Sequence, residues 1–182
     1  MTAPLPLVES DADAFFRVLF QRELAYVHRS VQRLGVPPRD AQDVTHDVFV
    51  VVHRKLSSYD RARPLRPWLL AIAARVASDY RRLSRNRLEH VGAAVAEPQD
   101  ERPAQDAQLE QRDARALVLQ ALQAVDEDRR PLLIMVDLDE VSVPDAASAL
   151  ELPLNTAYSR LRLGRQELTA AVRRLQARGG VR

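Results

Sequence analysis

The segment SVPDAASALELPLNTAYSRLRLGRQELTAAVRRLQ, residues 142–176, contains two helical patterns separated by a short break. Ser142 followed three residues later by Asp145 is typical of a helix N-terminus, where side-chain oxygens accept from free backbone N–H groups. The break at 151–154 is followed by a longer helical pattern over about 155–176. Two helices joined by so short a connection predict a helix-turn-helix.

The second of these helices has two distinct faces when its residues are placed at about 100° per residue. One face is apolar and consists of Ala157, Leu161, Gly164, Leu168, Val172 and Leu175. The opposite face carries Asn155, Ser159, Arg162 and Gln166, flanked by Tyr158 and Leu163. A recognition helix presents residues of this kind to base edges in the major groove.

Positive charge is concentrated on this helix. Residues 155–182 contain 7 Arg and 1 Glu, whereas residues 114–154 contain 3 basic and 8 acidic residues. A basic helix suits attraction to DNA phosphates, which supply most sequence-independent affinity. The same arginines also fit a solvated surface or stabilisation of the helix dipole, so the pattern alone leaves both interpretations open.

The composition of the whole chain excludes several classes of protein. It has 182 residues, with 27 Lys plus Arg, 25 Asp plus Glu and no Cys. The absence of Cys excludes disulfides, thiolate metal sites and Cys nucleophiles. No secretory signal is readable in residues 1–10, and no apolar run approaches the roughly 20 residues of a membrane span. These features predict a soluble, cytoplasmic protein.

Helical periodicity extends over both ends of the chain, and no segment shows convincing strand alternation. The predicted helices cover about 10–34, 40–56, 67–83, 113–125, 130–138, 143–150 and 155–176. Ser10 with Asp13 is expected to cap the first helix, and Gly35 with the Pro37-Pro38 pair to end it. Between them, residues 86–113 hold 3 basic and 7 acidic residues and little apolar periodicity, which predicts a flexible acidic linker. The expected fold is therefore all-α, with two small helical domains, residues 10–85 and 114–178, joined by that linker.

The helix over 40–56 has an apolar stripe of Val44, Val48, Val51 and Val52, widened by Phe49. Its other side carries Asp43, His46, Asp47, His53 and Arg54, with Val50 among them. An apolar residue set in an acidic, polar face suits docking on another protein. A helix fully packed inside its domain is an equally good interpretation of the pattern.

The segment SSYDRARPLR, residues 57–66, mixes hydroxyl, aromatic and guanidinium groups. Such a loop can stack on and hydrogen-bond an unpaired base, while Arg75, Arg81, Arg82 and Arg85 of the next helix supply charge for the nucleic-acid backbone. The alternative is that Tyr59 and Trp68 are core anchors, which is the favoured role for Trp68.

Taken in order, these segments resemble the extracytoplasmic-function (ECF) sigma factors of bacterial RNA polymerase. The segments that resemble region 2 of that family are 40–49 (DAQDVTHDVF), 56–60 (LSSYD) and 67–82. Those that resemble region 4 are 121–125 (ALQAV), the helix-turn-helix and 156–165 (TAYSRLRLGR). The similarity spans roughly residues 13–177, and the ordered pair of regions is more specific than either motif alone.

The resemblance implies a transcription initiation factor and not an enzyme. Its partners would be core RNA polymerase and promoter DNA, with no catalytic residue, metal, cofactor or small-molecule substrate. The residues expected to contact core polymerase are Asp43, His46, Asp47 and Val50. Those expected to bind the −10 element, in part by capturing a flipped base, are Ser57, Ser58, Tyr59, Asp60, Arg61, Arg63, Arg75, Asp79, Tyr80, Arg81 and Arg82. Those expected to bind the −35 element are Asn155, Thr156, Tyr158, Ser159, Arg160, Arg162, Leu163 and Arg165.

The resemblance also implies an anti-sigma factor as a further partner. In this family the anti-sigma factor is often membrane-anchored, which would hold the cytoplasmic protein at the inner face of the membrane. The sequence departs from the family where Tyr158 and Leu163 replace the usual basic residues, and where His46-Asp47 replaces Gln with an acidic residue. The first two departures leave the −35 sequence open.

Two other functions are compatible with these residues. An ordinary helix-turn-helix regulator would bind duplex DNA without polymerase, usually at a two-fold symmetric site. A sigma-like interaction protein would bind an anti-sigma partner and lack promoter activity. A requirement for core polymerase separates the sigma factor from the regulator, and transcription output separates it from the interaction protein.

Overall fold

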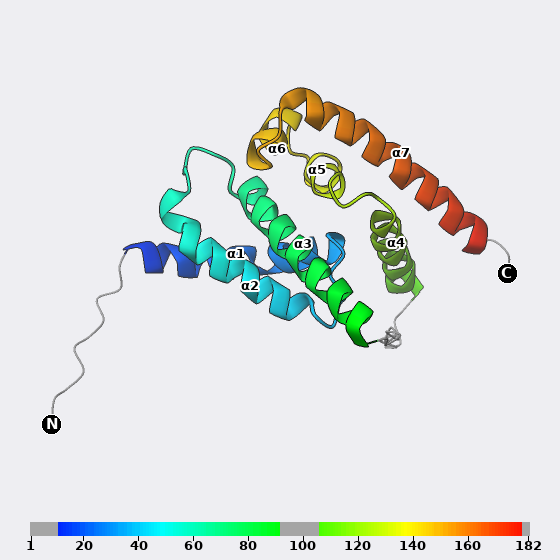
Figure 1. The fold of residues 1–182 in the computed structure, drawn as a ribbon, viewed down its shortest axis with the longest axis horizontal. Helices are drawn as coiled ribbons and strands as arrows, with labels where there is room; N and C mark the ends of the chain where they lie inside the picture. Colours follow the sequence, from blue (N-terminus) through cyan, green and yellow to red (C-terminus); the bar gives the residue numbers. More distant parts are fainter. Residues whose placement is uncertain (1–10, 92–105, 180–182) are drawn as a thin grey trace.

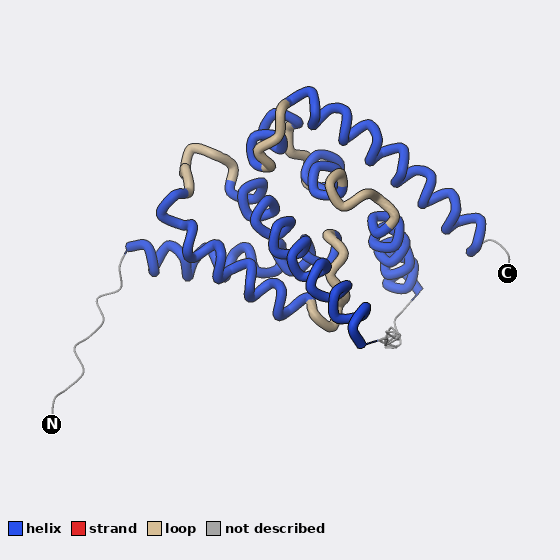
Figure 2. The backbone as a smooth tube through the Cα atoms, in the orientation of Figure 1, coloured by secondary structure: helices blue, strands red, loops and turns tan. Residues whose placement is uncertain are grey.

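The protein is described by a computed structural model that covers residues 11–91 and 106–179 of the 182-residue chain. Its elements, in chain order, are α1 (Asp11–Arg33), α2 (Ala41–Lys55), the 3₁₀ turn η1 (Leu56–Ser58), α3 (Leu65–Val91), α4 (Asp106–Gln123), α5 (Arg130–Leu133), the π-helical turn η2 (Ile134–Leu138), α6 (Val143–Ala149) and α7 (Leu154–Gly179). No strand occurs among these described residues, so the all-α prediction is confirmed (Figures 1 and 2). We refer to residues 11–91 as the first half and to residues 106–179 as the second half.

The first half is a bundle in which α1, α2 and α3 each contact the other two. Their apolar residues recur every three or four positions, so each helix directs one stripe inward. α1 stops at Gly35, whose φ of +99° is in the region that favours glycine, and the Val36 N–H donates back to the Val31 carbonyl at 3.1 Å. The end of α1 predicted at this glycine is confirmed.

The second half contains the predicted helix-turn-helix, formed by α6 and α7. At the start of α6 the Asp145 N–H donates to Ser142 Oγ at 3.2 Å, and the Ser142 hydroxyl donates to the Asp145 carboxylate at 2.6 Å. This cap is the one predicted from the sequence. α7 packs along α4, α5 and α6 through its apolar stripe, in which Ala157 and Leu161 are buried.

The helix predicted over 130–138 divides into two parts. α5 is α-helical, whereas η2 is a π-helical turn in which the Asp139 N–H donates to the Ile134 carbonyl, five residues back, at 3.0 Å. Ile134 and Met135 at the start of η2 are fully buried, and Asp137 is exposed. The wider turn thus keeps the apolar residues in the core and a carboxylate on the surface.

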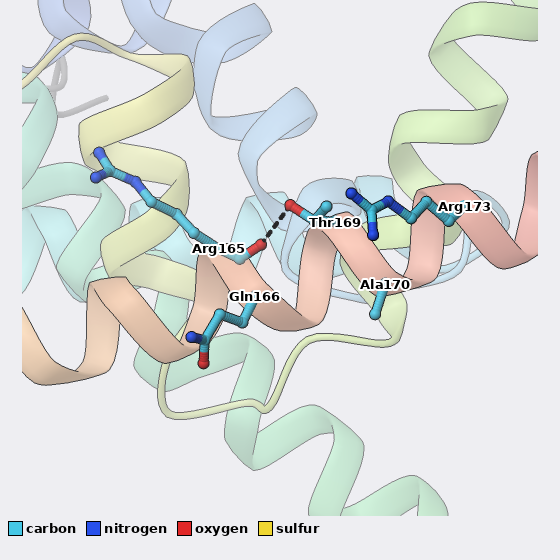
Figure 3. A pocket seen from close by; sticks show the side chains of 5 residues that line it. All are labelled: Arg165, Gln166, Thr169, Ala170 and Arg173. Atoms are coloured by element: carbon cyan, nitrogen blue, oxygen red, sulfur yellow. Dashed lines mark hydrogen bonds between the residues drawn. The ribbon is translucent and has the colours of Figure 1, made fainter.

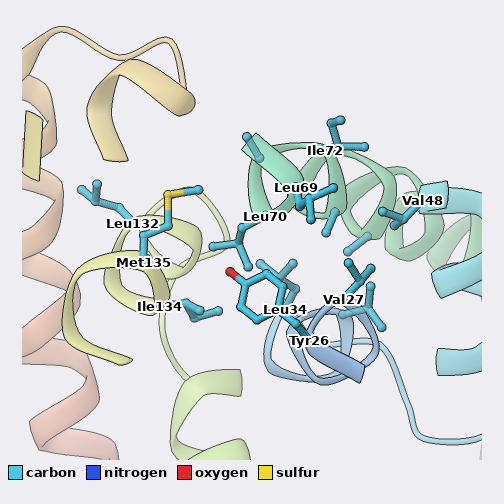
Figure 4. Packing of buried hydrophobic residues seen from close by; sticks show 14 of the residues in the cluster. Tyr26, Val27, Leu34, Val48, Leu69, Leu70, Ile72, Leu132, Ile134 and Met135 are labelled. Carbon is cyan, nitrogen blue, oxygen red and sulfur yellow. The ribbon is translucent and has the colours of Figure 1, made fainter. Parts of the chain in front are cut away.

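The two halves share one hydrophobic core. Leu34, Leu69 and Leu70 of the first half belong to the same buried cluster as Ile134 and Met135 of the second. Figure 4 shows Met135 on the side of Leu70, and Ile134 on the side of Leu34 and the Tyr26 ring. The sequence predicted two small domains joined by a linker and left open how they are arranged, so this continuous packing is a feature that it did not indicate.

Polar contacts border this shared core. The Tyr26 hydroxyl donates to Asp139 Oδ2 at 2.7 Å, and Arg33 pairs with Asp139 Oδ1 at 3.1 Å. Burial and the bond to Asp139 raise the pKa of Tyr26 well above its ordinary value. The phenol is therefore held protonated as a donor across the two halves.

A buried guanidinium joins the ends of three segments. Arg130, only 4% exposed, donates to the carbonyls of Leu34 (3.0 Å), Gln123 (3.2 Å) and Val125 (2.8 Å). Burial, and next the neighbouring Arg81, lower the pKa of Arg130 to about 10. Gly35 leaves room for this group, because a Cβ there would lie 2.5 Å from Arg130 Nη1.

The segment predicted as a linker is helical at both of its edges. α3 continues to Val91 and α4 begins at Asp106, while residues 92–105 lie outside the described residues. Residue Ser10, expected to cap α1, also lies outside them. Within the described part of the chain, no helix combines the length and apolarity needed to cross a bilayer.

Candidate nucleic-acid interface

The predicted polymerase-binding residues lie on one face of α2. Asp43, His46 and Asp47 are exposed and Val50 is half-buried, while Val44, Val48 and Val52 on the other face are buried. None of the first three side chains has a hydrogen bond or ion pair with another described residue. α2 thus presents a contiguous acidic and polar strip that is open to a partner.

The predicted base-capture loop, residues 57–66, runs from η1 into the start of α3 and is mostly exposed. Within it the Tyr59 hydroxyl donates to the Arg63 carbonyl at 2.6 Å, and Asp60 accepts from the Ala62 N–H at 3.0 Å. These two bonds fold the loop on itself. Ser57 and Ser58 of η1, at its start, and Arg61 remain exposed.

Two aromatic contacts support this loop. The Tyr59 ring lies 4.6 Å from the ring of Trp68, which is half-buried against the core at the start of α3. Arg61 lies over the Phe15 ring at 4.5 Å, so the beginning of α1 also contacts the loop. Trp68 thus combines the predicted anchoring role with a stacking partner that the sequence did not specify.

The arginines of α3 line the surface next to the loop, and several are already paired. Arg75 contacts Glu151 at 2.9 Å and Arg81 contacts Glu127 at 3.2 Å, both in the second half. Arg82 pairs with Asp79 one turn earlier on α3 at 3.1 Å. Arg81 also donates to the Leu34 carbonyl.

Tyr80 of α3 faces the start of α2. Its hydroxyl donates to Asp40 at 2.5 Å, and burial together with this bond raises the pKa of Tyr80. The side chain is only half-exposed, so the predicted −10 residues Asp79 and Tyr80 have different surroundings. Asp79 is on the open surface and Tyr80 ties α3 to α2.

The predicted reading face of α7 is open. Asn155, Tyr158, Ser159 and Arg162 are exposed, with Tyr158 at 52%. Thr156 and Leu163 are half-buried and border this face. The first four side chains therefore lie where a major groove could receive the N-terminal turns of the helix.

Three ion pairs hold α7 to the segment before α6. Arg165 binds the Asp137 carboxylate of η2, Arg160 contacts Asp128 at 3.8 Å, and Glu167 accepts from Arg129 and from the Asp126 N–H. Arg160 and Arg165 were both predicted to bind the −35 element. In this structure their guanidinium groups contact the protein.

The carboxylates that pair with the predicted DNA-binding arginines were missed by the sequence analysis. Glu127, Asp137 and Glu151 lie 46, 28 and 76 residues from Arg81, Arg165 and Arg75 along the chain. No local spacing relates residues so far apart. The excess of acidic over basic residues in 114–154 was the one feature of the sequence that pointed to carboxylate partners for these arginines.

Each half of the chain matches a known family model. Residues 19–87 match the model of Sigma-70 region 2, and residues 115–168 match that of Sigma-70, region 4. The RNA polymerase sigma factor NccH of Alcaligenes xylosoxydans xylosoxydans is 29% identical over 164 residues, which is 88% of each chain. The ECF RNA polymerase sigma factor SigE of Mycolicibacterium smegmatis is 31% identical over 147 residues, 78% of this chain and 55% of SigE.

Two solved structures share the fold. The sigma factor RpoE from Bartonella quintana, in complex with the anti-sigma factor NepR, superposes with a TM-score of 0.69 over 87% of this chain and 97% of RpoE, at 21% identity. CnrH in complex with the cytosolic domain of CnrY gives a TM-score of 0.59 over 85% of each chain, at 26% identity. With both regions matched in order over more than half of its length, the chain belongs to the sigma-70 family of RNA polymerase sigma factors, in the ECF group.

Proposed function

We propose that this protein binds core RNA polymerase through α2 and directs it to promoters by contacts of the first half with the −10 element and of α7 with the −35 element. As a sigma factor it is a transcription initiation factor and not an enzyme. The observation that carries the proposal is that both sigma-70 regions match in order, and that each brings an exposed binding face with it.

The face proposed for core polymerase is the strip of Asp43, His46, Asp47 and Val50. Its support is the division of α2 into a buried valine stripe and an open acidic side. A half-buried Val50 among exposed polar residues gives a docking helix a small apolar contact at the centre of a polar rim. The strip has no competing intramolecular partner among the described residues.

The face proposed for the −10 element combines the 57–66 loop with α3. Ser57 and Ser58 at the start of this loop are exposed, and the Tyr59–Trp68 ring pair offers a platform on which an unpaired base can stack. Unstacking one base costs a few kcal/mol, which such contacts offset. Arg75 and Arg81 would contact the DNA backbone once released from Glu151 and Glu127.

For the −35 element we assign reading to Asn155, Tyr158, Ser159 and Arg162, the four exposed residues of the α7 face. Arg162 is suited to bidentate bonds with a guanine, and the Tyr158 ring to contact with a thymine methyl group. Tyr158 and Leu163 replace basic residues of the family pattern, so a −35 preference distinct from that of relatives is expected.

Functionally, we assign core and −10 binding to residues 10–85, −35 binding to residues 114–178, and the connection to the acidic segment 86–113. We also propose an anti-sigma factor as partner, acting on a cytoplasmic sigma factor and able to hold it at the membrane. RpoE and CnrH, the structural relatives, were both solved in complexes, with NepR and with CnrY respectively.

Core-dependent run-off transcription tests this function. The full chain is added to bacterial core polymerase on a fragmented genomic library from the source organism, with core alone as control. Specific start sites that share spaced −10 and −35 elements are expected. Core binding without start sites would favour an interaction protein, and DNA binding without core binding would favour a helix-turn-helix regulator.

A variant pair tests the assignment of α7. Arg162→Ala is expected to weaken binding to the −35 element by roughly 1–3 kcal/mol, because a bidentate base contact is lost. Arg173→Ala removes another exposed arginine of the same helix, three turns further on, and is expected to leave promoter choice unchanged. Equal effects of the two variants on a fixed promoter, at matched salt, would contradict the assignment.

A further inference from the structure

Arg165 of α7 is held by a carboxylate of its own half. Its Nε lies 2.9 Å from Asp137 Oδ2, and its Nη2 lies 2.6 Å from Asp137 Oδ1. Two nitrogens facing two oxygens form the bidentate geometry that is strongest between these groups. The hydrogen bond to Asp137 raises the pKa of Arg165.

The direction of the side chain agrees with this pairing. Figure 3 shows the Arg165 guanidinium extending over the α5–η2 segment, away from Arg173 on the same helix. The Arg165 carbonyl accepts from the Thr169 hydroxyl at 2.8 Å, one turn further along α7. Arg165 borders a surface hollow together with Gln166, Thr169, Ala170 and Arg173, and its guanidinium points to η2.

Asp137 stands on a rigid support. It belongs to the π-helical turn η2, whose Ile134 and Met135 are fully buried in the shared core. The wide turn is closed by the bond from the Asp139 N–H to the Ile134 carbonyl. A carboxylate on an anchored turn can hold a long side chain at a lower entropic cost than one on a free loop.

The arginines of the N-terminal part of α7 therefore differ in their freedom. Arg162 is exposed and has no hydrogen bond or ion pair to any residue that the structure describes. Arg160 has a longer contact, 3.8 Å, with Asp128, which is 79% exposed. Arg165 has the shorter and better-aligned of the two ion pairs, at 2.6 Å.

Charge neutralisation decides what each arginine contributes to DNA affinity. A protein gains affinity by releasing counterions from phosphates that its positive charges neutralise. An arginine already neutralised by its own carboxylate adds no net charge and releases no counterion. On this argument Arg162 contributes to the electrostatic affinity of α7, and Arg165 does not.

We propose that Arg165 is a positioning residue that fixes α7 on η2, and that Asp137 limits the sequence-independent DNA affinity of the helix by withholding this guanidinium from the phosphates. The proposal rests on the DNA-binding role proposed above for α7. As a consequence, less of the protein would be bound to non-promoter DNA, because a genome offers about 10⁶–10⁹ competing non-specific sites. Recognition of base edges would then depend on the unpaired residues of the exposed α7 face, among which Arg162 is the main cation.

The test measures binding of the full chain to a random-sequence DNA duplex at 50–200 mM salt. Asp137→Asn frees Arg165 and is expected to steepen the slope of log affinity against log salt by about 0.9, the value for one phosphate. Over this range that equals an additional loss of about 3.5-fold. Arg165→Ala is expected to leave the slope unchanged, and the double variant to match Arg165→Ala.

Two control variants make the result specific. Glu140→Gln adds the same net charge just after η2 without releasing an arginine, because Glu140 is exposed and has no partner among the described residues. Arg162→Ala removes an unpaired arginine and is expected to lower the slope by about 0.9. A merely structural pair would lower the melting temperature in Asp137→Asn and leave the slope alone.

Two outcomes would overturn the proposal. In the first, Arg165→Ala lowers the slope as much as Arg162→Ala does, which would make Arg165 a phosphate contact. In the second, Asp137→Asn binds with the slope of the parent protein or of Glu140→Gln. Failure of the sigma-factor function would appear separately, as the absence of core-dependent start sites in the transcription assay.

Discussion

The arginines of α3 and those of α7 differ in where their partners lie. Arg75 and Arg81 of α3 bind carboxylates of the opposite half, whereas Arg160 and Arg165 of α7 bind carboxylates within their own half. DNA binding by α3 would therefore compete with contacts between the halves. The reading face of α7 is available without any such change.

The two proposed DNA surfaces are therefore not equivalent in the isolated chain. Arg63 of the base-capture loop also lies 3.4 Å from Ser148 of α6, so α6 stands beside both the loop and α3. Use of Arg75 and Arg81 by the proposed −10 surface would require their contacts with the second half to break, which separation of the halves would achieve. The resistance to separation must come from the shared core or from the polar contacts at its border, and substitutions can distinguish the two.

The largest effect is expected for the core. Ile134→Ala removes a fully buried side chain where the halves meet and should lower the free energy of unfolding by about 2–5 kcal/mol. Trp68, the single tryptophan, reports on the first half, so its fluorescence and the helical circular dichroism are followed together in urea. Both transitions are expected to shift by the same amount, because one core serves both halves.

Val118→Ala is the matched control for this variant. Val118 is an apolar residue of α4 that is 39% exposed, and its substitution should change stability by less than about 0.5 kcal/mol. If Ile134→Ala shifted the circular dichroism while Trp68 kept its parental transition, the halves would be independent units. Packing between the halves would then not restrain the DNA surface proposed for α3.

An intermediate effect, with a pH signature, is expected for Tyr26→Phe. The hydroxyl lost is the one that donates to Asp139, and its removal should lower stability by about 1 kcal/mol at neutral pH. Because the pKa of Tyr26 is raised in the folded state, its contribution is complete below about pH 10 and declines as pH rises above that value. The parent should therefore lose stability more steeply than Tyr26→Phe above pH 10.

Urea denaturation at a series of pH values from 8 upward measures this difference. Tyr158→Phe is the control, since Tyr158 is 52% exposed on α7 and its hydroxyl has no partner among the described residues. Parallel pH profiles for the parent and Tyr26→Phe would show that the Tyr26–Asp139 bond does not join the halves in solution.

Much of this fold could be predicted from local sequence. Helical periodicity placed the helices, Gly35 marked the end of α1, and Ser142 with Asp145 marked the start of α6. These signals are local because each reflects backbone geometry or hydrogen bonding within a few residues. The exposed faces of α2 and α7 follow from the same periodicity.

The features that the sequence did not indicate depend on long-range contacts. Ile134 and Met135 are ordinary apolar residues in the sequence, and nothing nearby says that they pack on Leu34 and Leu70. Arg130 was expected to lie in a helix, but its burial also depends on the carbonyl of Leu34, 96 residues away, beside the nearby carbonyls of Gln123 and Val125. The pairs formed by Arg75, Arg81 and Arg165 are equally non-local, so the predicted DNA-binding residues could be named without their partners.

The smallest effect is expected for Glu151→Gln, which removes a pair between the halves and leaves the core intact. Arg75 is 56% exposed and Glu151 is 74% exposed, and ion pairs so open to water contribute about 0–1 kcal/mol. Stability should thus change by less than about 1 kcal/mol, measured by urea denaturation beside Glu140→Gln. A substitution so weak cannot by itself separate the halves, whereas Ile134→Ala should ease separation. If Glu151→Gln instead matched the effect of Ile134→Ala, the border contacts and not the core would hold α3 away from DNA.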